Sequence, residues 1–428
     1  MQHLPEKGHA AVQVFQRQAL VYAVHAQKLD WKRFTTEQFV KWYQIEVEPL
    51  KRITPDIPCT TNLMGIYPGI NYYRLAEVMD FACWDSYPQW ESTLNDVETA
   101  QFFAFEHDLT RGLKDGKPFF LMANSHDPHR PYVGADDEMF YFGHHTTADR
   151  IYTPEEITVP GCLPDLPDVR KELAQYFSSV HRGDQIVGKI LQALDDMGYR
   201  DDTLVLFLSD NGMALPYAKT NCYLNSTKSP YIMRWPGRIP AGSVSDALVS
   251  GIDFTPTVLD VLGIEPIVDA DGRSMKHTIM EGAEQYDDIF TLFFKTNNNH
   301  ITHRALHFPM RCVQNKRFAY IFNAWSDGET TFLNESTEGL TFKAMEKAAE
   351  TDSYIRHRVD FFKYRVTEEL YDYVTDPHAK NNLIEKQEYQ ELLNRLRVRM
   401  YQYMKQSQDG LIDSFYQKVV KPNGLDVQ

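Results

Sequence analysis

Residues 118–125 (PFFLMANS) form a short apolar run that ends in a polar segment rich in proline and histidine, residues 126–132 (HDPHRPY). An apolar run of this length, bounded by turn residues, predicts a strand buried on both faces, as in the parallel sheets of α/β proteins. Ligands of open α/β sheets bind outside the carboxyl ends of the strands. His126 and His129, with a proline between them, are therefore candidates for meeting an anion or a leaving group, although such a pair alone is more often simply solvated.

The sequence before this strand alternates between helical and extended patterns. The expected elements are a helix over 31–52, strands over 57–65 and 80–88, and a helix over 94–114. Thr35 or Thr36 is expected to cap the first helix, with Glu37 as the partner in a capping box. Strands that alternate with helices predict parallel β/α packing.

The sequence after residue 132 alternates in the same way. The expected elements are a helix over 168–198, strands over 203–212 and 231–237, a helix over 253–264, an antiparallel hairpin over 311–324 and a helix over 383–407. The predicted fold class is therefore α/β, with a parallel core sheet followed by a C-terminal antiparallel subdomain.

Composition excludes several classes of protein. The formal net charge of −15 argues against nucleic acid as a partner, because phosphates need clustered Lys and Arg. None of the five cysteines forms a CxxC pair, which argues against a zinc ribbon or a dithiol redox site. The first residues show no signal peptide, and no apolar run is long enough to span a membrane. We expect a soluble chain that stays where it is made.

Three polar residues of the second half are candidates for binding an ion. Asp210 and Asn211 end the strand predicted over 203–212, and a carboxylate beside an amide oxygen suits a hard cation such as Ca²⁺. The alternative is that Asp-Asn-Gly is simply a turn, which those residues favour. Lys219 lies in an irregular segment and gains meaning only in combination with the other motifs.

These motifs occur in a characteristic order, which is HDPHRPY (126–132), SDNG (209–212), AKTNCYLNSTKSPYIMRWPGRIPAG (218–242) and LVSGIDFTPTVLDVLGI (248–264). Over about residues 117–428 the chain resembles the sulfatase family of the alkaline phosphatase superfamily. The late segments FPMRCVQNKRFAYIFN (308–323) and EELYDYVTDPHAKNNL (368–383) resemble its heparan N-sulfatase, or sulfamidase, branch.

The resemblance implies roles for particular residues. These are His129 and Lys219 in catalysis, His126 and Arg311 in substrate binding, and Asp210 and Asn211 as Ca²⁺ ligands. It also implies a hydrolase for a sulfate ester or an N-sulfate of a glycan. Ca²⁺ and cationic side chains would neutralise the sulfate and the charge that develops as the S–O or S–N bond breaks.

Two parts of the sulfatase chemistry have no counterpart in this sequence. The family nucleophile is a Cys or Ser in C/S-x-P/A-x-R that is oxidised to formylglycine, and no cysteine or serine here begins such a motif. The paired Asp residues that give the family two further metal ligands have no match before residue 117. We therefore predict a partial Ca²⁺ site and negligible hydrolysis of sulfate.

Residues 29–122 resemble a different family, the family 42 glycoside hydrolases or β-galactosidases. The resemblance rests on residues 29–65, on MDFACWDSYPQW (79–90) and on FEHDLTRGLKDGKPFFLM (105–122). It implies a slice of a (β/α)₈ barrel, in which Trp84, Asp85 and Tyr87 lie near a sugar site or simply pack in the core. The nucleophile Glu of that family follows the strand PFFLM, where this sequence has Ala123, and the acid/base Glu has no counterpart.

The two resemblances meet at residues 116–122, which fit both families. A recombination or an error of assembly at this shared segment would produce such a chain. The predicted domains are a barrel fragment over 1–122, a partial sulfatase catalytic domain over 117–310 and a sulfatase C-terminal subdomain over 311–428. The expected partner is a sulfated glycan. The alternatives are a β-galactosidase fragment and a non-catalytic remnant that binds Ca²⁺ or sulfated sugar; the sequence predicts neither the oligomeric state nor the final compartment.

Overall fold

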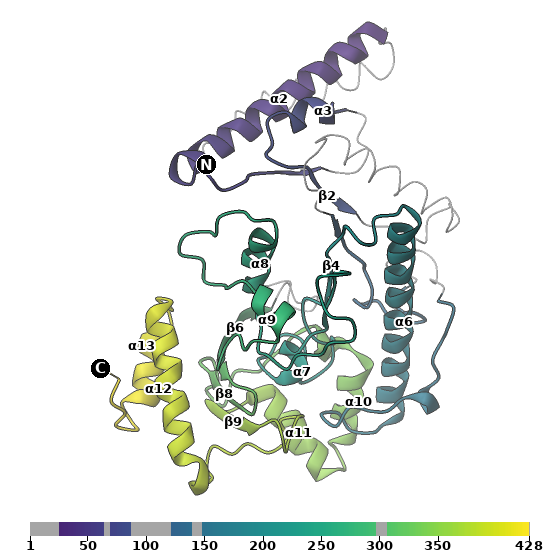
Figure 1. Ribbon diagram of the computed structural model, residues 1–428. Coiled ribbons are helices and arrows are strands. Elements are labelled where there is room, and N and C mark those ends of the chain that lie inside the picture. Colours follow the sequence, from purple (N-terminus) through teal and green to yellow (C-terminus); the bar gives the residue numbers. More distant parts are fainter. Residues whose placement is uncertain (1–24, 64–68, 87–120, 139–147, 297–305, 428) are drawn as a thin grey trace, which may run out of the picture. The chain divides into compact units, whose positions relative to one another are not determined.

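The computed structural model describes residues 25–63, 69–86, 121–138, 148–296 and 306–427 (Figure 1). The chain divides after His126 into two compact units. In the described part, no helix is both long and apolar enough to cross a membrane.

In the described residues of the first unit there are a long helix, a short helix and three short strands. They are α2 (His25–Ile53), α3 (Tyr72–Ala76), β1 (Asn62–Leu63), β2 (Cys83–Ser86) and β3 (Met122–Ala123). The strands pair in the order β1-β2-β3, and both pairings are parallel, which confirms the packing predicted for this half. The helix predicted over 94–114 lies outside the described residues.

The predicted cap of the first helix is wrong, because the described helix α2 already includes His25. Thr35 and Thr36 lie inside the helix, where their hydroxyls donate to the carbonyls of Trp31 and Lys32 at 2.9 and 2.8 Å. Serine and threonine inside a helix form this bond to the preceding turn. Thr36 Oγ1 also accepts the backbone N–H of Asn71 at 2.9 Å, and so ties α2 to the start of α3.

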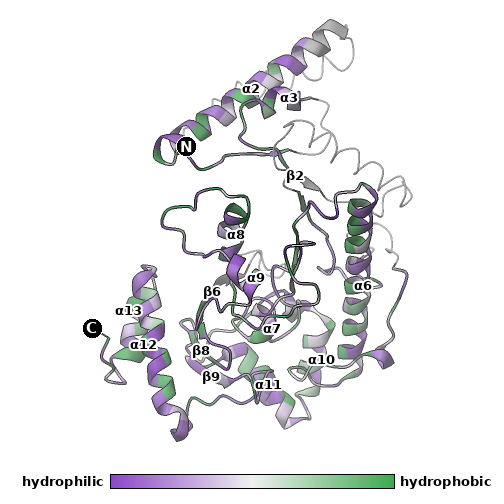
Figure 2. Cartoon of the chain, in the orientation of Figure 1, coloured by the Kyte–Doolittle hydropathy of each residue, from purple (hydrophilic) through white to green (hydrophobic). Residues whose placement is uncertain are grey.

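The second unit begins with a long helix, α6 (Pro167–Asp196), which confirms the helix predicted over 168–198. Hydrophobic and hydrophilic residues alternate around it, as expected of a helix with one face on a core (Figure 2). The chain leaves the helix through Gly198, whose φ of +76° is a left-handed conformation that glycine adopts without strain.

The other elements of the second unit follow in the order in which the chain reaches them. They are η1 (Pro154–Glu156) before α6, then β4 (Val205–Leu208), α7 (Leu224–Thr227), β5 (Tyr231–Arg234), η2 (Gly251–Asp253), α8 (Phe254–Val261), α9 (Lys276–Glu281), β6 (Ile289–Thr296), β7 (Leu306–Gln314), β8 (Phe318–Asn323), η3 (Glu335–Glu338), α10 (Leu340–Ala348), α11 (Ser353–Tyr364), β9 (Glu368–Asp372), η4 (Gln387–Tyr389), α12 (Gln390–Gln406), α13 (Ile412–Phe415) and η5 (Tyr416–Val420). The strands predicted over 203–212 and 231–237, the helix over 253–264 and the late helix all form, the last beginning only at Gln390.

β4 and β5 pair with each other in the antiparallel sense, whereas the sequence predicted parallel neighbours in this core. The reason lies in their connection. The chain leaves β4 at Ser209 and returns at Pro230, whose carbonyl accepts the Ser209 N–H at 3.3 Å, so the loop begins and ends at the same edge of the pair. A connection that returns to the end where the first strand stopped makes the pair antiparallel.

The second sheet, β6-β7-β8-β9, is antiparallel throughout and includes the predicted hairpin over 311–324. Its side chains alternate between two apolar clusters, as the period of a strand requires. In β8, Ala319 and Ile321 belong to one cluster and Tyr320 and Phe322 to the other. The helices that share the first cluster include α6, α10 and α11, and α12 contributes to the second.

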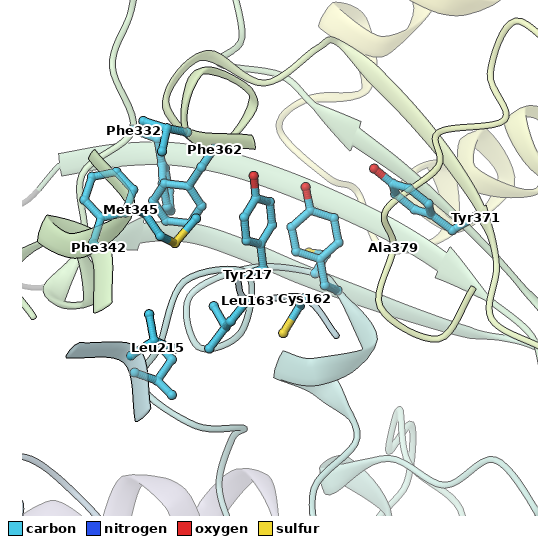
Figure 3. Close-up of a cluster of buried hydrophobic side chains, with 14 of the residues drawn as sticks. Cys162, Leu163, Leu215, Tyr217, Phe332, Phe342, Met345, Phe362, Tyr371 and Ala379 are labelled. Atoms are coloured by element: carbon cyan, nitrogen blue, oxygen red, sulfur yellow. The ribbon is translucent and has the colours of Figure 1, made fainter. Parts of the chain in front are cut away.

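The larger cluster is dominated by aromatic rings. Figure 3 shows Phe342, Met345 and Phe362 gathered on one side of Tyr217. The Tyr217 and Phe362 rings meet edge to face, with centroids 5.2 Å apart, a geometry that adds to the gain from burial alone. This cluster joins α10 and α11 to the loop after β4, which carries the candidate site.

Replacing Thr36 with valine should loosen the contact between α2 and α3. Valine keeps the shape of threonine but leaves the Asn71 N–H without its acceptor, at a cost of about 1–2 kcal/mol. We expect amide hydrogen exchange of residues 69–79 to become about tenfold faster. Thr35→Val is the matched control, because Thr35 makes only the bond within its own helix. Equal effects of the two variants would contradict the role assigned to Thr36.

Candidate functional site

The segment that carries His129 is anchored to α6 by a buried ion pair. Arg182 Nε and Nη2 donate to the two carboxylate oxygens of Asp127, each at 2.7 Å. The side chains of Arg182 and Asp127 are only 9% and 3% exposed. A bidentate pair fixes geometry as well as charge, so the chain enters the 127–132 segment in one defined position.

A second anchor is the carboxylate of Glu172, also on α6. Arg130 Nη2 donates to Glu172 Oε1 at 2.6 Å, and the backbone N–H groups of Leu340 and Thr341 donate to the same carboxylate at 3.1 and 2.7 Å. These two N–H groups open α10, where a negative charge is favoured by the helix dipole. Glu172 thus joins α6, the 127–132 segment and α10.

Lys219 lies in the loop between β4 and β5, where two backbone N–H groups donate to the same carbonyl. The Met213 carbonyl accepts the N–H groups of Leu215 and Lys219, at 2.9 and 3.0 Å. The residues around Lys219 include two with left-handed backbone, Tyr217 with φ of 64° and Thr220 with φ of 66°. Such conformations cost about 1–3 kcal/mol each in residues with a side chain.

Side-chain contacts hold both left-handed residues in place. The Tyr217 hydroxyl donates to the backbone carbonyl of Arg358, and Asn334 Nδ2 donates to Thr220 Oγ1 at 2.6 Å. Strain that is fixed in this way from outside the loop is typical of functional sites. The structure therefore gives Lys219 a defined position, which its sequence context did not.

Lys219 pairs with one carboxylate, and Arg130, which pairs with another, contacts the loop that carries Lys219. Lys219 Nζ lies 3.2 Å from Glu335 Oε1, and Arg130 Nη2 donates to the carbonyl of Ala214 in the Lys219 loop at 3.3 Å. Burial alone would lower the pKa of Arg130, but the nearby oxygens of Tyr132 and Glu172, and then of Glu335, raise it overall. The result is a cluster of two cations and two carboxylates, largely withdrawn from solvent.

His129 stands next to this cluster along the chain. Its ring is exposed, and Nδ1 lies 2.6 Å from the carbonyl oxygen of Arg130. A ring nitrogen so close to a carbonyl oxygen is expected to carry the proton, which would leave Nε2 as the acceptor of the neutral ring. His126 belongs to the first unit, and its side chain is exposed too.

Asp210 and Asn211 follow β4 directly and begin the loop that contains Lys219. Asp210 is exposed and Asn211 is half-buried. They offer two neighbouring oxygen donors, whereas Ca²⁺ takes six to eight. Over the described ranges, no group of three or more His, Cys, Asp or Glu side chains is arranged to hold a metal ion. These residues do not by themselves form a closed Ca²⁺ site.

Arg311 lies in β7 and is engaged in a buried ion pair. Its guanidinium donates to both carboxylate oxygens of Asp409, with Nη2 to Oδ1 at 2.9 Å, and its side chain is 10% exposed. A substrate could reach this guanidinium only if the pair opened. The structure therefore gives Arg311 a packing role between the sheet and the segment after α12.

The structure thus brings the neighbourhood of His129 and the Lys219 loop together, and places Asp210 and Asn211 at the start of that loop. Sequence reasoning missed Arg130, Glu172 and Glu335. Arg130 was within the HDPHRPY motif and could have been found there. The two carboxylates carried no local signal, because the Arg130–Glu172 contact spans 42 positions and the Glu172–Leu340 contact spans 168.

Comparison with known proteins finds two family models in the chain. Residues 215–332 match the model described as N-sulphoglucosamine sulphohydrolase, C-terminal, and residues 14–130 match the β-galactosidase model of glycoside hydrolase family 42. Both resemblances predicted from the motifs are confirmed.

Individual relatives divide the chain in the same way. Human N-sulphoglucosamine sulphohydrolase is 30% identical over 318 residues, which are 69% of this chain and 62% of the relative. β-Galactosidase BglY of Alicyclobacillus acidocaldarius is 47% identical over 103 residues, which are 24% of this chain and 15% of that enzyme. The chain therefore spans about three fifths of the first relative and a small part of the second.

A solved structure supports the fold. A Bacteroides thetaiotaomicron protein, described as a 4S-sulf from a locus for the metabolism of multiple glycosaminoglycans, matches with a TM-score of 0.53 at 19% identity, over 76% of this chain and 61% of that one. The fold is thus that of the sulfatases, the alkaline-phosphatase-like fold, with the family 42 fragment before it.

Gly212 tests whether the loop after β4 must hold its present shape. A Cβ added there would lie 1.8 Å from the carbonyl oxygen of Asn225, so Gly212→Ala must displace backbone. We expect a loss of roughly 1–3 kcal/mol or more in unfolding free energy, measured in urea. Gly188→Ala is the control, because its Cβ meets nothing within 4 Å inside α6, and it should stabilise by about 0.5–1 kcal/mol. A neutral Gly212→Ala would show that the loop adapts freely.

Proposed function

We propose that this chain, whose residues 117–428 are related to the sulfatases, recognises a sulfated glycan with its second unit and does not itself hydrolyse the sulfate. The observation that supports the proposal is the half-buried ion pair of Lys219 with Glu335, in a loop that Arg130, the neighbour of His129 in the chain, also contacts. The human relative is named for N-sulphoglucosamine, so a glucosamine N-sulfate is the sugar to test first.

The cluster suits a sulfate group for electrostatic reasons. The Lys219 side chain is only 19% exposed, and a charge pair in such a partly dry place is stronger than one in water. Arg130 is already paired with Glu172, so it contributes positive potential rather than a free donor. Within the described residues, the carboxylate that Lys219 pairs with is Glu335, and an incoming sulfate can replace or share it.

Glu335 also limits the affinity. In the absence of ligand its carboxylate balances Lys219, so a sulfate must compete with an ion pair that already exists. We infer modest binding, in which Lys219 supplies the main charge-assisted hydrogen bond and the exposed ring of His129 adds a second donor when protonated.

The cysteines give no support to catalysis. No Cys or Ser begins the C/S-x-P/A-x-R motif from which formylglycine is made. Burial raises the pKa of Cys162 to about 11 and that of Cys222 to about 12, so both thiols stay protonated near neutral pH. A protonated thiol is a poor nucleophile, and we therefore propose binding without turnover.

The first unit offers a second candidate function, that of a β-galactosidase, on the strength of its family match and its parallel strands. β3 ends in Ala123, at the position where the family has its nucleophile Glu. Retaining glycosidases need two carboxyl groups a few ångströms apart, and three strands cannot close an eight-stranded barrel. We propose that this unit contributes no glycosidase activity.

Calorimetric titration of the full chain with glucosamine N-sulfate tests the leading proposal. We expect saturable binding that is lost when the sugar lacks its sulfate. Lys219→Met should weaken binding about 10- to 100-fold, the value of a hydrogen bond to a charged group. Lys228→Met is the matched control, because Lys228 is an exposed lysine of the same loop, and it should change the affinity less than twofold.

The same samples test turnover. Sulfate release measured by ion chromatography should not exceed the blank over a day. Robust release of sulfate would overturn the assignment of a non-hydrolytic role, and unchanged binding by Lys219→Met would overturn the placement of the sulfate at Lys219.

Calcium should bind weakly, if Asp210 and Asn211 are its main protein ligands. With so few ligands we expect a dissociation constant of about 10⁻⁴–10⁻³ M in a calorimetric titration of the full chain. Asp210→Asn should abolish this binding, and Asp201→Asn, an exposed aspartate before β4, should leave it unchanged. Submicromolar affinity, or affinity that survives Asp210→Asn, would place the ion elsewhere.

A further inference from the structure

A small cavity on the second unit is lined by two cations and several apolar side chains. Its volume is about 90 Å³, and its walls include Cys162, Leu163, Met345 and Ile355 together with Arg358 and Lys380. A single water molecule needs roughly 10–15 Å³ of such space, so this cavity has room for a molecule of several atoms. Figure 3 labels Cys162, Leu163 and Met345 near Tyr217, in the apolar cluster that forms one side of the cavity.

Among the arginines that the structure describes as buried, Arg358 and Arg365 have no carboxylate partner, and Arg365 donates instead to Tyr223 and Asn221. Arg358 is only 6% exposed, and its Nη2 atom is buried without a hydrogen-bond partner among the described residues. Arg311 and Arg397 are buried to a similar degree, yet each donates twice to a carboxylate, Asp409 and Glu368 respectively. In the part of the chain that the structure describes, the contact of the Arg358 guanidinium is with the ring of Tyr217, with its Cζ atom 3.8 Å from the centroid.

An unpaired buried cation is costly. Removing a charge from water costs several kcal/mol, and a cation–π contact returns only about 2 kcal/mol. Nothing in the described part of the chain supplies the missing negative charge. An anion in the cavity that Arg358 lines would offset this cost.

Lys380 and His378 are two further polar residues at or next to this cavity. The backbone N–H of Lys380, a residue that lines the cavity, donates to Asp376 Oδ2 at 2.7 Å, which fixes its backbone. His378 has a buried Nδ1 without a partner in the described structure, and its ring packs against Gly161, another wall residue. Cys162, Arg358 and Lys380 line the same cavity, and burial raises the pKa of the Cys162 thiol while the two cations oppose that rise.

We propose that this cavity binds a small aliphatic carboxylate, whose carboxylate group pairs with Arg358 and Lys380 and whose hydrocarbon body lies against Leu163, Met345 and Ile355. Arginine pairs with a planar carboxylate through two parallel hydrogen bonds. An inorganic oxyanion carries polar oxygens on every side, and the apolar walls would leave some of them without partners. A carboxylate with a short chain matches both parts of the lining.

Titration of the full chain with sodium butyrate, at constant ionic strength, tests the proposal. We expect saturable binding below about 10 mM by calorimetry. Butyramide, which has the same shape without the charge, and sodium sulfate, which has the charge without the apolar body, should bind at least tenfold more weakly. Equal binding of butyramide, tighter binding of sulfate, or no saturable binding of butyrate would each overturn the proposal.

Variants locate the ligand. Lys380→Gln should weaken butyrate binding at least fivefold, and Lys386→Gln, an exposed lysine outside the cavity, should leave it unchanged. Arg358→Met should abolish binding without lowering the melting temperature, because it removes a charge that has no partner. If Arg358→Met does not fold, Lys380→Gln decides, and a Lys380→Gln variant that binds like the wild type overturns the assignment.

The site is separate from the one proposed for sulfated sugar. Lys219→Met should leave butyrate binding unchanged, so either proposal can fail while the other stands. A loss of butyrate binding in Lys219→Met would contradict the assignment of the carboxylate to Arg358 and Lys380.

Discussion

The buried carboxylate of Glu172 is the contact on which the candidate site depends. It accepts a hydrogen bond from Arg130 and two more from the first N–H groups of α10, and it does so from the middle of the interface between α6 and α10. The junction leaves no room at Gly339, where a Cβ would lie 2.5 Å from Arg130 Nη2 and 2.6 Å from Glu172 Oε1. Glycine is needed here because two charged groups approach the backbone closely.

The residues just before α10 connect this junction to the loop that carries Lys219. Asn334 Nδ2 donates to Thr220 Oγ1 at 2.6 Å, and Oδ1 of the same side chain accepts the hydroxyl of Ser336 at 2.7 Å. Glu335 stands between them and faces Lys219. The left-handed backbone of Thr220, next to Lys219, is therefore supported by the segment just before α10, whereas that of Tyr217 is held by Arg358 of α11.

Apolar periodicity predicted most of the second unit, including α6, α8, α12 and the β7–β8 hairpin, because each of these elements buries one face against a core. The predictions were wrong where a helix start or a strand pairing is determined by residues outside the apolar pattern. The start of α2 depends on residues before Trp31, and the antiparallel pairing of β4 with β5 depends on where the 209–230 loop returns. Lys219 was found through its motif, whereas Glu172 and Glu335 matter only through contacts with residues far away in the sequence.

Residues 127–133 lie where the two family resemblances meet, and their side-chain and backbone partners all come from one helix of the second unit. Asp127 pairs with Arg182, Arg130 with Glu172, and the Val133 N–H with Ser179 Oγ at 2.9 Å, and all three partners lie on α6. The family 42 match runs to residue 130, yet the side chains on which His129 depends are those of a sulfatase-like helix. Because α6 also carries the carboxylate that opens α10, the position of His129 and that of Lys219 follow from the same helix. Any recognition of sulfate by these two residues is therefore a property of the second unit, whatever sequence precedes it.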